Sequence, residues 1–316
     1  MPLVFSSQLT GRSSGEVSSI GQETTLTVNP CTPYGAVIRG LDIAKGALAA
    51  GQVTELLAYL DEYHVLIFRG HSSPEDAKYL EFVSSFGEVE LTDIVPNQVR
   101  PERPEIVIIS NDVKEGASIG PAQSASALDW HSDYCWQERV SQIGSIEALE
   151  LPVSGGGETW FSNMYAVYEA LDPAVRERLW SLSGLHIRDT TSPQYEGSAY
   201  QPLRQAEHPL VMTHPSSGRR ALYVNHFYTA RILGLSEVES RSMLDEFFAL
   251  ANEPRFIYEH HWELGDLVIW DQLGLVHGRN PFDTKERRCM RQITVAVSNI
   301  EAPWPVRTGT CVQLAQ

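Results

Sequence analysis

The sequence predicts a mainly β protein with flanking helices and a double-stranded β-helix core, the jelly-roll or cupin-like arrangement. Three observations favour this fold class. Short apolar or alternating runs separated by turn residues recur along most of the chain. Helical periodicity is confined to a few segments between these runs. The chain also contains no internal repeat.

With 316 residues, the chain is long enough to bury one large core, and we expect a single catalytic domain over residues 24–316. Residues 1–23 are rich in Ser and Gly and are expected to form a loose N-terminal tail. Two polar or small-residue segments near 97–128 and 189–208 are too long for ordinary connections, so we interpret them as lids.

In the first third of the chain, the patterns predict strands at 24–28, 65–68 and 106–109 and a helix at 47–63. A second helix is predicted to begin at an Ser73 N-cap, with Pro74 at its first position and Gly87 after its end. Its helically spaced apolar residues are expected to face the core: Tyr79, Phe82, Val83 and Phe86.

In the middle of the chain, we expect strands at 143–151, 158–161 and 185–188. Two helices, 163–171 and 173–182, follow the N-cap candidates Ser162 and Asp172. The last third alternates short strands with turns and is interrupted by one helix that begins at an Ser236 cap. The strands predicted there are 210–213, 221–224, 256–260, 267–270 and 292–297.

The formal net charge of -16 argues against nucleic acid or an anionic membrane as a partner. No apolar run approaches the roughly 20 residues that span a bilayer, and the N-terminus has no signal-peptide pattern, so we expect a cytoplasmic protein. The four cysteines are far apart and are expected to be reduced. The sequence is compatible with a homo-oligomer.

Two motifs about 145 residues apart carry the predicted chemistry: Trp130-His131-Ser132-Asp133 and the stretch that ends in His277. We expect His131, Asp133 and His277 to meet in the fold, with His277 on an extension of the strand at 267–270. Two imidazoles and one carboxylate can hold Fe(II) on one face and leave adjacent positions open for dioxygen and a bidentate 2-oxo acid. Arg288 then suggests a co-substrate that carries a carboxylate.

Alternatives to this interpretation remain open at the level of the sequence. A zinc-dependent hydrolase could use the same three ligands, and a non-catalytic 2-oxoglutarate-binding protein could retain them. Cys135 is a candidate fourth ligand because it lies two residues beyond Asp133. The triplet His261-Trp262-Glu263 also has ligand chemistry, although a role at a strand end fits it better.

Several motifs in a consistent order resemble the taurine dioxygenase/TfdA family of Fe(II)- and 2-oxoglutarate-dependent oxygenases. The resemblance extends from about residue 35 to residue 297 and rests on residues 65–70, 86–88, 130–133, 156–159, 213–215, 222–225, 265–266, 270–271, His277 and Arg288. It implies that His131, Asp133 and His277 bind Fe(II) and that Arg288 and Thr159 hold 2-oxoglutarate. It also implies oxidation of a small-molecule C–H bond with dioxygen and release of succinate and carbon dioxide. Hydroxylation is the default outcome, and desaturation or another oxidation uses the same centre.

Two departures from the family pattern limit the substrate. Gln292 stands where the taurine enzyme has a second Arg, with Arg291 one position away, and Thr92 stands where that enzyme has a sulfonate-contacting His. A sulfonate needs strong cationic donors, so taurine is disfavoured. The retained Asp133 argues against a halogenase, which needs that coordination position for chloride. We expect the substrate pocket to involve Trp130, Tyr134, Asn225, His226 and Arg291.

Overall fold

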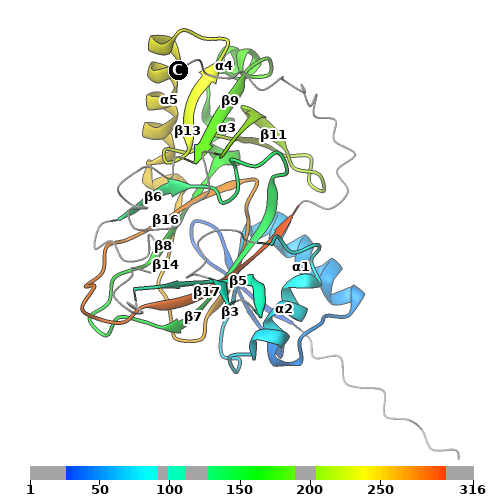
Figure 1. Cartoon of the computed structure of the whole chain (residues 1–316). Helices are drawn as coiled ribbons and strands as arrows, with labels where there is room; N and C mark the ends of the chain where they lie inside the picture. The colour runs from blue at the N-terminus through cyan, green and yellow to red at the C-terminus, as the bar shows by residue number, and fades with distance from the viewer. Residues whose placement is uncertain (1–25, 92–98, 101, 112–126, 189–203, 297–316) are drawn as a thin grey trace, which may run out of the picture.

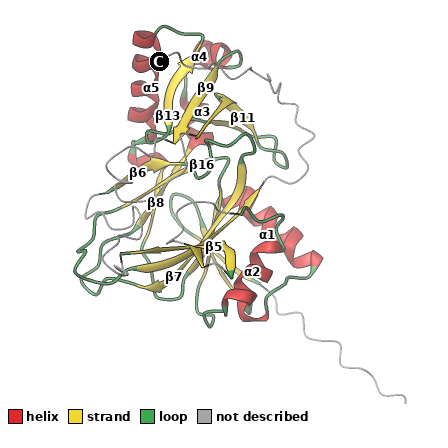
Figure 2. Ribbon diagram, viewed as in Figure 1, coloured by secondary structure: helices red, strands yellow, loops and turns green. Residues whose placement is uncertain are grey.

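The computed structural model describes residues 26–91, 99–100, 102–111, 127–188 and 204–296. These residues form five α-helices and several sheets in a mainly β arrangement, as expected (Figures 1 and 2). The predicted tail 1–23 lies outside the described residues, as do most of both predicted lids. Within the described ranges, no helix has both the length and the apolar character that crossing a membrane requires.

The largest sheet has eight strands in the order β1-β2-β3-β15-β7-β17-β5-β4, and all its neighbours are antiparallel except β2 and β3. Helices α1 (Ala50–Tyr63) and α2 (Asp76–Ser84) pack on this sheet through a shared apolar core (Figure 1). The strands are β1 Thr27–Pro30, β2 Ala36–Arg39, β3 Val65–Phe68, β4 Val99–Arg100, β5 Arg103–Ser110, β7 Ser141–Glu150, β15 Leu267–Asp271 and β17 Cys289–Ala296.

A four-stranded sheet in the order β14-β8-β16-β6 lies against the other face of the large sheet. Its strands are β14 Ile257–His260, β8 Thr159–Asn163, β16 Leu275–Arg279 and β6 Leu128–His131. One buried core contains Ile67 and Trp270 of the large sheet together with Phe161 and Leu275 of the small one. The two sheets therefore pack face to face, and this packing sets β6 and β16 opposite β17.

A third layer covers the outer side of the small sheet (Figure 2). Trp130 of β6 and Val276 of β16 point into its core, which is otherwise formed mainly by helices and short strands. Its members are α3 Met164–Ala170, α4 Pro173–Leu179, α5 Glu237–Ala251, β9 Ser183–Arg188, β10 Arg204–Pro209, β11 Val211–Thr213, β12 Arg220–Leu222 and β13 Thr229–Leu233. Consequently β16 is buried along its whole length, and β6 is buried at Trp130 and His131.

Two helix starts differ from the prediction because the expected capping side chains have other partners. Helix α2 begins at Asp76, since the Ser73 hydroxyl donates to Glu147 Oε1 at 2.6 Å. Helix α3 is capped by Asn163, whose side chain accepts from Ala166 N, while the Ser162 hydroxyl donates to a main-chain carbonyl of α5. The Ser236 cap of α5 is confirmed, with a reciprocal capping box to Glu239.

Several strands were not predicted, or were predicted with different boundaries. Strands β2, β6, β10, β13 and β16 are short, and all five contain polar or charged residues that obscure the apolar pattern. Strand β10 corrects the prediction of a lid at the end of the 189–208 segment, because residues 204–208 pair with β9. Tyr79, Phe82 and Val83 are buried in the core as predicted, and Phe86 packs against it.

A tight turn carries the chain from the large sheet at Asp271 to the small sheet at Leu275. Asp271 Oδ1 accepts from the backbone N–H groups of Leu273 and Gly274 at 3.0 and 3.2 Å. Its other oxygen accepts from the Tyr165 hydroxyl at 2.5 Å. At Gly274, a Cβ atom would lie 1.8 Å from the Tyr165 ring. The turn therefore requires glycine, and it fixes where β16 begins.

We predict that Gly274→Ala destabilises the protein by about 1–3 kcal/mol, because the new methyl group must displace the buried Tyr165 ring. Urea unfolding measures this change. Gly51→Ala is the control: this position in α1 has open space around its Cβ and should gain up to about 1 kcal/mol from helix propensity. Equal stability of Gly274→Ala and wild type would contradict the packing of this turn.

Two buried imidazoles lie away from the predicted site. Burial lowers the pKa of His64 to about 4 and that of His186 to about 3. Charges on Arg219 and His214 also lower the His64 pKa, and Arg219 Nη1 donates to His64 Nε2 at 2.7 Å. His186 packs beside the rings of His208 and Tyr223. Both imidazoles are therefore neutral in the folded protein at neutral pH.

We predict that stability falls as pH drops below about 6.5, because each unfolded histidine then takes up a proton that the folded state excludes. For each buried imidazole, the unfolding free energy falls by at most about 1.4 kcal/mol for each unit that the pH drops. This fall ends near pH 4 for His64 and near pH 3 for His186. Between pH 6.5 and 5.0, His186→Phe should lose about 1.5 kcal/mol less unfolding free energy than wild type in urea titrations. An identical loss of unfolding free energy in both proteins would contradict the assignment of His186 as a neutral buried imidazole.

Candidate metal centre

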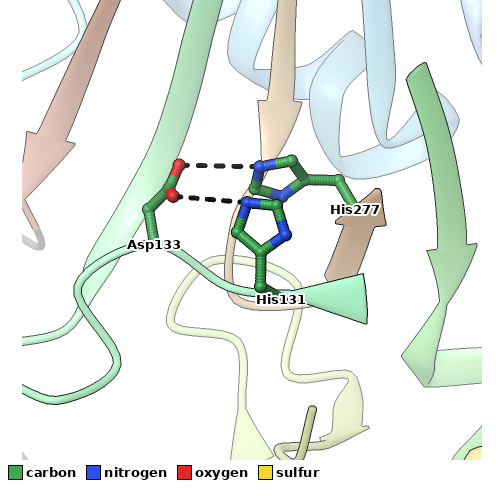
Figure 3. A group of neighbouring side chains, drawn as sticks. All are labelled: His131, Asp133 and His277. Atoms are coloured by element: carbon green, nitrogen blue, oxygen red, sulfur yellow. Dashed lines mark ion pairs between the residues drawn. The ribbon is translucent and has the colours of Figure 1, made fainter. Parts of the chain in front are cut away.

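The three predicted ligands converge in the structure (Figure 3). His131 ends β6, and His277 is its cross-strand partner on β16, with ring centroids 4.1 Å apart. Asp133 lies two residues after His131, and its Oδ1 is 3.8 Å from His131 Nε2. Its Oδ2 is 3.6 Å from His277 Nε2. One ligand atom from each residue lies within 4.8 Å of the other two, which is a spacing that a single metal ion can bridge.

The environment of both imidazoles suits metal binding. His131 Nδ1 lies 2.8 Å from the carbonyl oxygen of Asp129, which can only accept, so Nδ1 carries a proton and Nε2 is the nitrogen that faces Asp133. Burial, and secondarily the nearby His131, lowers the pKa of His277 well below its ordinary value. Two imidazole nitrogens and one carboxylate therefore face the same point.

His277 reaches this point from a strand of its own. The prediction that it lies on an extension of the strand at 267–270 is wrong, because the turn after Asp271 moves the chain into the other sheet. The imidazole packs between the Trp270 ring of β15 and the Phe161 ring of β8, at 5.0 and 6.2 Å between centroids. These aromatic walls restrict its rotamer.

The other candidate ligands lie elsewhere. Cys135 is not part of the cluster formed by the described residues; its buried thiol faces the Asn225 amide, and burial raises its pKa. Glu263 pairs with Arg69 at 2.6 Å, and His261 is exposed. Among the described residues, the donor set is therefore two histidines and one aspartate, without a fourth protein ligand. Such a set fits a catalytic metal better than a structural zinc.

Arg288 lies immediately before β17 and contacts Gly157, two residues before Thr159. Its guanidinium is buried, and its Nη2 donates to the carbonyl oxygen of Gly157 at 3.0 Å. Its Nε has no hydrogen-bond partner among the described residues. Burial, followed by repulsion from Arg279, lowers the pKa of Arg288 to about 9. A Cβ atom at Gly157 would lie 2.8 Å from Arg288 Nε, so glycine permits this close approach.

Thr159 begins β8, and one hydrogen-bond partner of its hydroxyl oxygen is defined. The Trp262 indole N–H donates to Thr159 Oγ1 at 3.1 Å, which leaves the hydroxyl proton to be donated to another group. Thr159 is also the cross-strand partner of the buried Arg279 on β16. Sequence analysis missed both Trp262 in this role and Arg279; the only signal for Arg279 was its position two residues after His277, on the same face of the strand.

All five predicted pocket residues have structural partners. Trp130 donates to Asn252 at 2.7 Å, and Asn225 accepts from Tyr228 N at 2.7 Å. His226 pairs with Asp129 at 2.5 Å. Arg291 is corrected: it points to the opposite face of β17, where it pairs with Glu147 and Asp76.

The surroundings of the centre are aromatic, and they include Phe227, which sequence analysis did not single out. The rings of Phe227 and Tyr228 lie 6.1 and 6.3 Å from that of His131. Tyr228 packs on Trp136 at 4.5 Å, and Trp136 packs on the fifth predicted pocket residue, Tyr134, at 5.7 Å. No spacing pattern marks such a group, because its members come from two irregular loops.

Comparisons with known proteins agree with this geometry. The family described as "Taurine catabolism dioxygenase TauD, TfdA family" matches residues 27–294. Pentalenolactone F synthase from Streptomyces arenae is 38% identical over 297 residues, which cover 88% of this chain and 97% of that enzyme. Alpha-ketoglutarate-dependent 2,4-dichlorophenoxyacetate dioxygenase from Cupriavidus pinatubonensis is 32% identical, with coverage of 85% and 97%.

Solved structures of dioxygenases are also similar to this chain. The structure of AAD-2 in complex with Mn(II) and N-oxalylglycine superimposes with a TM-score of 0.74 at 25% identity, covering 87% of this chain and 98% of that one. A putative alpha-ketoglutarate-dependent taurine dioxygenase from Burkholderia xenovorans gives a TM-score of 0.72 at 26% identity, with coverage of 87% and 93%. The likeness implies a jelly-roll fold. The chain therefore belongs to the TauD/TfdA family and is an alpha-ketoglutarate-dependent (2-oxoglutarate-dependent) dioxygenase.

Proposed function

We propose that His131, Asp133 and His277 bind Fe(II) and that the enzyme oxidises a C–H bond of a small organic molecule. The observation that carries this proposal is the convergence of two imidazoles and one carboxylate with no fourth ligand among the described residues. Fe(II) bound in this way supplies dioxygen-dependent decarboxylation of 2-oxoglutarate to succinate and carbon dioxide, with the oxidising power for C–H cleavage. A zinc hydrolase would leave Arg288 and Thr159 without a role.

Arg288 and Thr159 would hold the distal carboxylate of 2-oxoglutarate. The guanidinium is buried close to a second buried arginine, Arg279, whose positive charge it repels. Burying like charges together is costly unless an anion neutralises them. A carboxylate at this position would accept from Arg288 Nε and from the Thr159 hydroxyl, whose own oxygen already accepts from Trp262. The co-substrate would thereby be oriented with its other end toward the metal.

The two facing sheets would form the walls of the jelly roll, with the metal centre between them. Support comes from the core shared by Phe161, Trp270 and Leu275, and from the contact between Gln292 of the large sheet and Asp133 beside the small one. Tyr134, Trp136, Phe227 and Tyr228 would line the substrate side with aromatic surface and exclude water from the reacting C–H bond.

The substrate would be a small organic molecule other than taurine. Gln292 replaces the arginine that the taurine enzyme has at this position, and Arg291 is fully occupied on the opposite face of the strand. Relatives at 38% and 32% identity are named for pentalenolactone F synthesis and for oxidation of 2,4-dichlorophenoxyacetate. We expect hydroxylation as the default reaction and desaturation or another oxidation as variants of it.

The ligand assignment predicts the behaviour of the anaerobic Fe(II) and 2-oxoglutarate complex. Wild type should show a weak visible metal-to-ligand charge-transfer band, and His131→Ala should lose it with the loss of a metal ligand. Arg288→Ala should need about 30-fold or more 2-oxoglutarate for half-saturation, because losing one partner of a buried charge pair costs about 2–5 kcal/mol.

The matched control is Arg255→Ala, which removes an exposed arginine paired with Glu253 and should leave the band unchanged. A wild-type protein without a band would contradict the proposed centre. A normal titration of Arg288→Ala would contradict the co-substrate site alone.

Substrate identity can be tested with small-molecule extracts. Incubation with enzyme, Fe(II), 2-oxoglutarate and dioxygen should convert one compound to a product that has gained one oxygen or lost two hydrogens. Mass spectrometry should detect this change together with an equivalent amount of succinate, and His131→Ala should produce neither. Succinate release without any substrate-dependent increase would contradict oxidation of a molecule in that extract.

A further inference from the structure

Position 292 lies on the central strand β17, and its side chain faces the metal ligands. Gln292 is buried, and its cross-strand partners are Val107 on β5 and Ile146 on β7. Its Nε2 lies 2.6 Å from Oδ2 of Asp133. An ionised carboxylate only accepts hydrogen bonds, so the amide nitrogen, rather than the amide oxygen, must face Asp133. The contact is a short, charge-assisted hydrogen bond.

The neighbouring residue fixes the orientation of this side chain. Successive residues of a strand point to opposite faces, and Arg291 is held on the far face by several contacts. Its Nε donates to Glu147 Oε2 at 2.6 Å, and Nη1 donates to Asp76 Oδ1 at 2.6 Å. Its Nη2 donates to the carbonyl oxygen of Pro74, also at 2.6 Å. This buried network sets the register of β17 and therefore directs Gln292 toward Asp133.

The hydrogen bond holds the Asp133 carboxylate beside the two imidazoles. Oδ2 accepts from Gln292 Nε2 and lies 3.6 Å from His277 Nε2, while Oδ1 lies 3.8 Å from His131 Nε2. A ligating carboxylate with one oxygen hydrogen-bonded to a neighbouring side chain has a fixed orientation. A neutral amide achieves this without placing a positive charge beside the metal, as an arginine at this position would.

We infer that Gln292 is a positioning residue that orients the Asp133 carboxylate for metal binding and is therefore not an anchor for an anionic group of the substrate. This inference rests on the proposed metal centre. It assigns a role to the position at which the sequence departs from the taurine enzyme. The substrate group nearest to position 292 would then be uncharged.

Binding of Co(II) without turnover tests the inference. Gln292→Met keeps the length of the side chain but removes the donor, and we expect its Kd for Co(II) to rise about 10–100-fold. At saturating Co(II), its visible d–d spectrum should differ from that of wild type, because Asp133 is free to reorient or to bind through both oxygens. Gln292→Asn is a second variant that keeps the amide but shortens its reach, and it should show the same direction of change.

Thr294→Val is the matched control, since Thr294 is a buried residue on the same strand and the same face, two positions away. It should keep the wild-type Kd and spectrum. The inference is overturned if both Gln292 variants bind Co(II) like wild type, or if Thr294→Val loses affinity to the same degree. Either result leaves the proposed function standing when wild type binds Co(II), whereas a wild type that fails to bind Co(II) contradicts the metal centre itself.

Discussion

The metal centre depends on the pairing of β6 with β16. Because His131 and His277 are directly opposite each other across these antiparallel strands, the sheet itself holds the two imidazoles side by side. β16 is covered on its outer face by the third layer and on its inner face by the large sheet, and Trp130 of β6 packs into the third layer. A slip of one residue in this pairing would turn one imidazole away from the other, so the packing that stabilises the fold also determines the ligand geometry.

Charge is distributed unevenly around this centre. On the far face of β17, Arg291 is neutralised by Glu147 and Asp76, and the network ties α2 to the centre of the sheet. On the metal side, Arg279 and Arg288 both lie near the ring of Phe282, at 4.8 and 5.8 Å from its centroid. The Arg291 network on the far face stabilises the fold. Arg279 and Arg288 on the metal side create a positive region that suits a dianionic co-substrate.

Residue patterns predicted the mainly β class, the strand at Val65–Phe68, most helices and the convergence of His131, Asp133 and His277. The patterns located candidate metal ligands because only a few residue types, such as His and Asp, have side chains that bind iron. They failed where tertiary contacts compete with local preferences: Ser73 and Ser162 are good caps that instead bond to Glu147 and to α5. The separation of β15 from β16 was missed because only three residues, 272–274, lie between these two largely apolar strands. The decisive Asp271 turn depends on Tyr165, more than 100 residues earlier.

The Trp262–Thr159 contact favours one kind of group at this part of the site. The indole, which can only donate, occupies one lone pair of the Thr159 oxygen, so the hydroxyl proton is left for an acceptor. The buried Arg288 guanidinium, bonded to the carbonyl oxygen of Gly157 two residues before Thr159, would repel an ammonium group. A tryptophan that itself touches no reactant would thus help the binding site to prefer oxygen anions over amines.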